Sequence, residues 1–428
     1  MKMMSQLALA AALAGGAVLA TPLLAKDKEA AKPAGLKLTP AFIKAAKPAQ
    51  DAVNAGDPAT AEPLVAAAEA AGTNDDEKYV AAQMRLVLEQ KKINAAQTAN
   101  PNAAPDRTAM SKALDTLIAS PSTPAADKGK YYFYRASFAY EGKQYPVAID
   151  YFTKARDLGY ANDDLGLLLV KAKVESGDAA GGVAELDREI TKRAAAGTKA
   201  PEDWYRYAIA QSNKRHVKAT TLEWLNKYAV AYPTPKTWYE VLATYAIQQD
   251  SVSKLDNQQK IDIFRLMRAT GGLADQYYYI EYAQKAQNAG LPTEAQAVIK
   301  EGLANGKIPA ANTEAKALLT ETAKAIQLEG SLATLETKSR AASATAAYAA
   351  QTADAYLGQG NYAKAIDLYR IALGKPGVDA DTVNTRLGVA LARSGDKAGA
   401  QTAFAAVKGT PRNEIAQLWT TYLGVAAA

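Results

Sequence analysis

The sequence of 428 residues contains no cysteine and only one histidine. Without cysteine the chain can form no disulfide, offers no thiolate as a nucleophile or metal ligand, and cannot carry the lipidated cysteine of a lipoprotein. The single histidine, His216, cannot build a histidine metal cluster, and its neighbours indicate a turn between helices rather than a Ser-His-Asp triad. These absences argue against thiol, zinc and triad chemistry, and they leave packing alone to stabilise the fold.

Other catalytic patterns are also scarce. Ser251 and Lys254 have the Ser-x-x-Lys spacing of penicillin-recognising enzymes, but the accompanying Lys-Thr-Gly segment is missing and the pair lies in a predicted link between helices. The carboxylates of 72–79 and 161–166 precede apolar-periodic segments, where Asn and Asp cap helices. There is no phosphate loop and no glycine-rich dinucleotide fingerprint. We therefore expect no catalytic residue, no metal and no cofactor, and a protein that is not an enzyme.

Long apolar runs are missing after the N-terminus, since no later segment offers the roughly 20 apolar residues that a membrane helix needs. The N-terminus has a lysine at position 2, an apolar stretch over about 7–19, and small residues before a charged segment. This order is typical of a secretory signal peptide, and we expect cleavage after Ala25, with Ala20 as the second choice. An exported chain without cysteine fits a bacterial periplasm best, and release to the medium is the alternative.

A concentrated basic patch is missing too. The 50 basic and 44 acidic residues leave a net charge of +6, and the basic residues are scattered along the chain. Nucleic-acid binding usually needs them gathered on one face. We therefore expect a soluble mature protein with no membrane span, no lipid anchor and no nucleic acid partner.

What the sequence does contain is a repeated helical unit, clearest in "TADAYLGQGNYAKAIDLYRIALGKPG" from Thr352. Gly360 and Asn361 interrupt the helical pattern, because both residues accept the left-handed conformation of a tight turn. Small side chains stand at Ala365 and Ala372, where two helices must approach closely. One apolar face follows at spacings of three to four residues. It consists of Tyr362, Ile366 and Tyr369.

The same unit recurs along the chain. About 35 residues later it reappears with Leu387, Gly388, Gly395, Ala400 and Phe404. Upstream it reappears with Tyr145, Ala148, Ile149, Phe152 and Ala155. The pattern resembles the tetratricopeptide repeat over roughly 130–428, as in an exported bacterial protein of this family. The resemblance implies an all-α fold, a right-handed superhelical solenoid of antiparallel helix hairpins, with a concave groove that binds peptides or partner helices.

Proline-rich breaks and the quality of the repeat suggest how the chain is divided. We expect a signal peptide over 1–25 and a flexible mature N-terminus over 26–36. N-terminal hairpins with proline-rich links follow over 37–129, then a divergent solenoid over 130–344. The clearest repeats and a capping helix occupy 345–428.

Aromatic residues are concentrated in "YYFYRASFAYEGKQYPVAIDYF" (131–152). Helical spacing places one set of rings on the face of each first helix that we expect to meet the second helix of the same hairpin. These first-helix residues are Tyr131, Tyr134, Phe138, Trp204, Tyr207, Ala208, Trp238, Val241, Tyr245, Tyr279, Tyr282 and Ala283. Tyr145 and Phe152 complete the first hairpin, and we expect Phe133 and Tyr151 to pack against neighbouring hairpins.

A second set lies about 100° further around the first helices, because it follows each opening ring by one residue. In tetratricopeptide arrays this direction points into the groove, and tyrosine is enriched at recognition surfaces. The candidate partner-binding residues are Tyr132, Tyr140, Tyr205, Tyr239, Tyr277 and Ile280. The alternative is that they pack between adjacent hairpins. The family's clamp of Lys, Arg and Asn for a C-terminal carboxylate is not reproduced, since Tyr132, Ala136 and Ala139 stand there instead.

Three functions are compatible with this sequence. The first is a periplasmic scaffold or adaptor, without enzymatic activity, that holds a protein or peptide in its groove for cell-envelope assembly or maintenance. The second is a structural or self-associating module that acts through its outer helical faces. The third and most remote is an enzyme acting on envelope glycans, for which no catalytic glutamate can be singled out. The sequence specifies neither the partner nor the oligomeric state.

Overall fold

A computed structural model describes residues 35–102 and 104–426. The predicted signal peptide and residues 26–34 lie outside this range. Within it the regular structure is entirely helical, which confirms the all-α fold. The contacts divide the described residues into two compact units, unit 1 up to Ala195 and unit 2 from Ala196 onwards. The predicted boundary at 129/130 lies inside unit 1, within α6 (Ala125–Glu141). The predicted boundary at 344/345 lies inside unit 2, between α17 (Leu332–Arg340) and α18 (Ala346–Gly358), which pack on each other.

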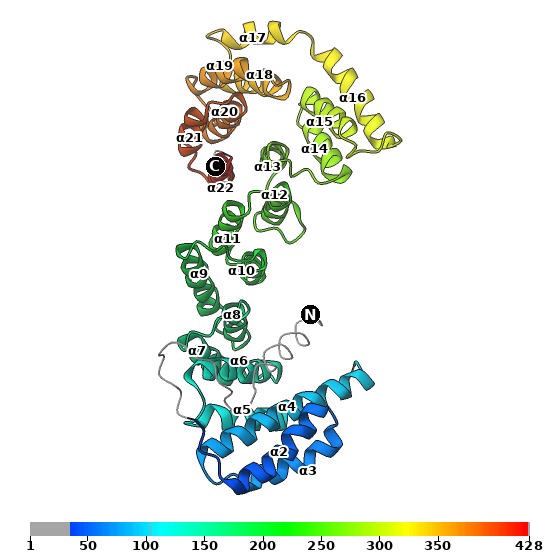
Figure 1. Cartoon of the computed structure of the whole chain (residues 1–428). Coiled ribbons are helices and arrows are strands. Elements are labelled where there is room, and N and C mark those ends of the chain that lie inside the picture. Colours follow the sequence, from blue (N-terminus) through cyan, green and yellow to red (C-terminus); the bar gives the residue numbers. More distant parts are fainter. Residues whose placement is uncertain (1–34, 103, 427–428) are drawn as a thin grey trace, which may run out of the picture. The chain divides into compact units, whose positions relative to one another are not determined.

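Unit 1 consists of successive antiparallel helices, each packed on the next (Figure 1). They are α2 (Pro40–Ala55), α3 (Pro58–Ala71), α4 (Asp75–Ala99), α5 (Thr108–Ala119), α6 (Ala125–Glu141), α7 (Tyr145–Asp157), α8 (Leu165–Glu175) and α9 (Ala179–Ala195).

Unit 2 continues the hairpin pattern, and its C-terminal helix α22 packs on α11, α13, α20 and α21 (Figure 1). Its helices are α10 (Glu202–Lys214), α11 (Lys218–Ala231), α12 (Pro235–Leu242), the π-helix η1 (Ala243–Ile247), α13 (Asn257–Ala269), α14 (Gln276–Asn288), α15 (Pro292–Ala304), α16 (Thr313–Glu329), α17 (Leu332–Arg340), α18 (Ala346–Gly358), α19 (Tyr362–Leu373), α20 (Ala380–Ser394), α21 (Lys397–Ala405) and α22 (Arg412–Val425).

Side-chain caps define several helix starts. Asn74 and Glu77 form a reciprocal capping box at α4, which confirms the capping interpretation of the acidic stretch 72–79. The second acidic stretch differs: Asp164 is the N-cap of α8 but makes no side-chain capping bond. Asn162 instead accepts a hydrogen bond from the Asp164 backbone at 2.9 Å. That stretch is therefore a tight turn stabilised by asparagine.

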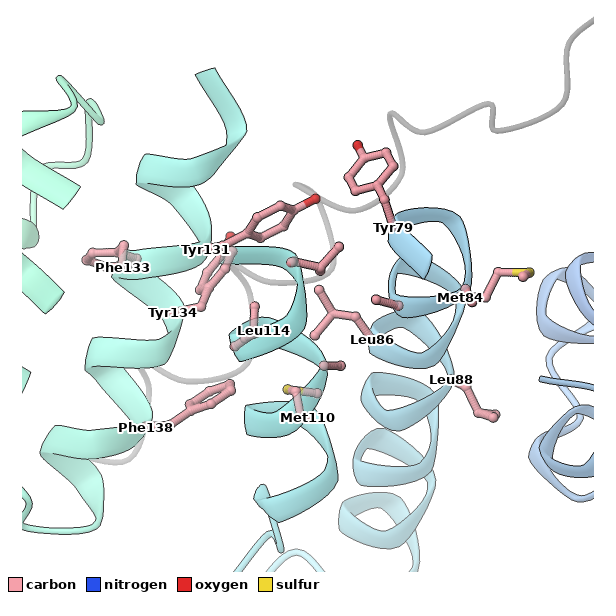
Figure 2. Packing of buried hydrophobic residues seen from close by; sticks show 14 of the residues in the cluster. Tyr79, Met84, Leu86, Leu88, Met110, Leu114, Tyr131, Phe133, Tyr134 and Phe138 are labelled. Atoms are coloured by element: carbon pink, nitrogen blue, oxygen red, sulfur yellow. The ribbon is translucent and has the colours of Figure 1, made fainter. Parts of the chain in front are cut away.

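The predicted first-helix core is buried, apart from the half-buried Tyr207. In the first hairpin, the helix that this core face meets was predicted wrongly. Figure 2 shows Tyr131 and Phe138 pointing from α6 towards α4 and α5 of the preceding hairpin. The second helix of their own hairpin, α7, is met instead by Phe133, whose ring lies 5.8 Å from that of Phe152.

Tyr151 also packs within its hairpin, with its ring 5.5 Å from that of Tyr132. Helix α6 is thus covered on two sides, by α5 and by α7. Because both faces are apolar, the spacing of the rings alone does not tell which face meets which neighbour.

Candidate partner-binding groove

A groove of about 540 Å³ lies in unit 2 between α10 and the α12–η1 segment, with α11 beneath it. Apolar side chains form its floor: Ile209 of α10, Leu225 of α11 and Val241 of α12 are 8%, 1% and 0% exposed. Ala210 and Gln248 are exposed on its rim. Mostly apolar concavities with a few polar groups are the usual form of binding sites.

A charge network borders the groove and connects its two sides. The Arg206 guanidinium on α10 donates from Nε to Glu240 on α12 at 2.9 Å and from Nη2 to Glu202 at 2.6 Å. The Tyr228 hydroxyl, on α11, donates to the same Glu240 carboxylate at 2.9 Å. The hydrogen bond to Glu240 raises the pKa of Arg206, and burial raises the pKa of Tyr228. Both groups therefore stay protonated at neutral pH, and Arg206 is already neutralised.

Two irregular backbone segments border the same groove. The π-helix η1 follows α12 directly, and single π-helical turns are frequent at functional sites. His216, at the turn after α10, has a φ of 57°, in the left-handed region that a residue with a Cβ seldom adopts. The Asn213 side chain donates to the Asp250 carbonyl at 3.3 Å and so joins the end of α10 to the segment after η1.

The structure brings only part of the predicted tyrosine column to this groove. Tyr239 lines it, and its hydroxyl lies 3.1 Å from that of Tyr278 on α14. Tyr278 in turn contacts Tyr277, whose side chain is 60% exposed. Tyr239 and Tyr277 thus belong to one aromatic cluster, joined by Tyr278, which sequence reasoning did not select.

Two predicted residues are buried, which corrects their assignment to an accessible surface. Tyr205 is 5% exposed, because its ring stacks on Tyr228 at 5.9 Å and meets Trp224 edge-on. Ile280 is 7% exposed. Tyr205 therefore packs on α11, the second helix of its own hairpin.

The two remaining candidates belong to unit 1. Tyr132 is half-buried against Tyr151, and Tyr140 is half-buried with its ring 5.8 Å from that of Tyr145. A role for either in partner binding stays a prediction.

Sequence reasoning missed most of the groove. Arg206 and Glu240 are 34 positions apart and pair only because two first helices lie side by side. Their one-repeat separation was a usable signal, since equivalent positions of successive repeats face the same groove.

Ser251 and Lys254, which have the Ser-x-x-Lys spacing, do not form a reactive arrangement. The Ser251 hydroxyl donates to the Ser253 carbonyl at 3.2 Å, and the Lys254 ammonium donates to the Gln249 carbonyl at 2.6 Å. The pair is therefore not arranged as nucleophile and base. Within 35–102 and 104–426, no group of three or more His, Asp or Glu side chains is placed to hold a metal ion. No helix in that range is both long and apolar enough to cross a bilayer.

Comparisons with known proteins give structural neighbours only. No family model matches the chain, and no curated protein matches it. Among solved structures, Naa15/Naa10 bound to HypK-THB aligns at 12% identity and a TM-score of 0.29, over 87% of this chain and 58% of that one. The apo form of RapI aligns at 11% identity and a TM-score of 0.19, over 78% and 96%. The chain thus spans little more than half of the first neighbour. Its fold class follows from its own helices.

Proposed function

We propose that the chain is a scaffold or adaptor, without enzymatic activity, that binds a segment of a protein partner in the groove of unit 2. The observation that carries the proposal is the apolar floor of Ile209, Leu225 and Val241, open between two first helices that a charge network connects. A segment lying there would bury apolar side chains on the floor, at about 25 cal/mol per Å² removed from water. The bordering network keeps its shape without the ligand, so little ordering is needed on binding.

The rim supports binding of a mixed-charge peptide. Lys214 and Asp250, of opposite charge, are both exposed on the lining. Arg206 and Glu240 neutralise each other and add no net charge. Electrostatics here would fix the direction and register of the peptide, while the apolar floor would supply the affinity.

We also propose that this function is performed in the bacterial periplasm, in cell-envelope assembly or maintenance. The order of charged, apolar and small residues at the N-terminus supports export. Cell fractionation and the mass of the purified protein test this part, with cleavage after Ala25 as the expected result. An uncleaved chain in the cytoplasm would contradict it.

The groove is tested by photo-crosslinking in cells, with p-benzoylphenylalanine at Gln248 and mass spectrometry of the product. We expect a defined partner segment. Ala210→Trp would fill the groove from its rim and abolish that crosslink. Ala398→Trp is the matched control, because Ala398 is also an exposed helical alanine of unit 2 outside the groove. Crosslinking that survives Ala210→Trp, or is lost equally in both variants, would contradict the proposal.

A further inference from the structure

A second groove, of about 570 Å³, lies in unit 1 and shares no residue with the groove of unit 2. Helix α4 forms its floor, and α3 and α5, which both pack on α4, form its walls. The lining of α4 runs from Lys78 to Lys92 at helical spacing, through Ala82, Arg85 and Glu89. Fourteen residues of helix rise about 21 Å, so the groove is straight and parallel to α4.

The floor and one wall of this groove carry small residues. Ala81 and Ala82 of α4 are 2% and 5% exposed, and Ala109 and Ala113 of α5 line the adjacent wall. Helices pack at 8–10 Å between axes, and small side chains allow the closer approaches. A straight channel between two helices, with alanines on part of its floor and along α5 and charged side chains along α3, has the shape that a further helix occupies.

The acidic side chains of the groove already have cationic partners. The Arg85 guanidinium is 2.7 Å from both Glu62 and Glu69, and 3.2 Å from Glu89. The Lys92 ammonium contacts Glu62 and lies 3.1 Å from Glu89. Hydrogen bonds from Lys92 and Arg85 lower the pKa of Glu62. A basic ligand would have to displace these cations.

Two cations of the lining are left without a partner. Lys78 and Lys112 are exposed, and neither ammonium forms an ion pair or side-chain hydrogen bond within the described parts of unit 1. One belongs to the floor helix α4 and the other to the wall helix α5. The charge that the groove can still accept is therefore negative.

We propose that the unit 1 groove binds an acidic amphipathic helix of a protein partner. Small apolar residues of that helix would lie over Ala81, Ala82 and Ala113. Its carboxylates would pair with Lys78 and Lys112. The site is formed by α3, α4 and α5 of unit 1, so it gives the chain a second docking surface besides the groove of unit 2, and it does not depend on that groove.

The test uses the purified full chain and a fluorescent helical peptide with alanine and leucine on one face and glutamate on the other. Fluorescence anisotropy should detect binding that weakens roughly tenfold in Lys78→Glu/Lys112→Glu, because two attractive pairs become repulsive. Lys44→Glu/Lys47→Glu is the matched control, with the same charge change on exposed lysines of α2 in unit 1. The control should bind as the unaltered chain does.

Two further peptides separate charge from shape. A version with lysine in place of glutamate should not bind, and an acidic version with a central proline should bind weakly because it cannot form a continuous helix. Circular dichroism reports whether the charge reversal disturbs folding. If it does, the milder Lys78→Gln/Lys112→Gln variant replaces it and should again bind the acidic peptide more weakly than the unaltered chain and the α2 control. No binding by the acidic helix, or equal loss in the α2 control, would overturn the proposal. So would a homodimer, seen by light scattering, that occupies the groove and is dissociated by the groove variant.

Discussion

Replacing Asp262 with asparagine is expected to destabilise unit 2 by about 3–5 kcal/mol, because Asp262 is the centre of a buried ionic cluster. Its side chain is fully buried and accepts hydrogen bonds from Arg265 and Arg412 at 2.7 Å and from Arg386 at 3.4 Å. Burial alone would raise the pKa of Asp262, but the attraction of the three guanidiniums holds it below its usual range. The carboxylate is therefore charged at neutral pH.

The magnitude follows from the charge balance of the cluster. Besides Asp262 it contains Glu294, paired with Arg265 at 2.6 Å, and Asp354, paired with Arg386 at 2.5 Å. Asparagine keeps the shape of residue 262 but removes its charge. Arg412 would then be buried without a counter-ion, since Asp262 is its ion-pair partner in the described part of the chain. The loss of one partner from a buried ion pair typically lowers the free energy of unfolding by about 3–5 kcal/mol.

The assay is urea unfolding followed by tryptophan fluorescence. All four tryptophans, at 204, 224, 238 and 419, belong to unit 2, so the signal reports that unit alone. Asp262→Asn should lower the free energy of unfolding by the stated amount, whereas Asp367→Asn, at an exposed ion pair, should change it by less than about 1 kcal/mol.

A double-mutant cycle tests the reasoning itself. Arg412→Gln added to Asp262→Asn restores the charge balance, so the pair should destabilise by about 1–3 kcal/mol less than the sum of the single changes. Strict additivity, or a loss below about 1 kcal/mol for Asp262→Asn, would refute the account of the cluster.

Two other predictions concern protons and packing. Hydrogen bonding by Thr39 and the Thr73 backbone lowers the pKa of Glu77 from 4.5 to about 2, so its contribution to unit 1 is present above pH 4.5 and is lost as the pH falls towards 2. Circular dichroism of thermal unfolding between pH 2 and 5 should show this loss, and Glu77→Gln should flatten it; an unchanged slope in that variant would count against the assignment. Gly388→Ala should destabilise unit 2 by about 1–3 kcal/mol, because the added Cβ would meet the Phe404 ring at 2.4 Å. Gly424→Ala, where the space is open on α22, should be neutral or stabilising by up to about 1 kcal/mol, and the opposite order in urea unfolding would contradict the packing described.

The helical hairpins were predictable because their signals are local. Gly360 and Asn361 were expected to form the turn of the clearest repeat, and α18 does end at Gly358 and α19 begin at Tyr362. The Asn361 side chain caps α19. The small residues expected where two helices approach closely were also predicted correctly, since Ala365 and Ala372 are fully buried. Turn chemistry and small side chains act within a few residues, so the sequence displays them directly.

Which neighbour each helical face meets could not be predicted. Tyr131 and Phe133 both lie on apolar faces of α6, yet one faces the preceding hairpin and the other its own partner helix. In the same way Tyr205 was expected on a surface and is buried against α11. A helix covered on two sides has two equivalent apolar stripes, and the periodicity of the sequence does not show which stripe meets which neighbouring helix.

The ionic cluster was invisible for a different reason. In the sequence, Asp262 and Arg265 of α13 have the i, i+3 spacing of an ordinary surface ion pair on a helix. Their other partners Arg386 and Arg412 lie 124 and 150 residues further along the chain than Asp262. Only the packing of α20 and α22 on α13 brings them together.

The most direct test of the proposed function is the affinity of the unit 2 groove for the partner segment that the Gln248 crosslink identifies. A synthetic peptide of that segment should bind the purified chain in a calorimetric titration. Ala210→Trp should weaken binding at least tenfold, and Ala398→Trp should leave it unchanged. Equal affinity for all three proteins would contradict the assignment of the groove as the binding site.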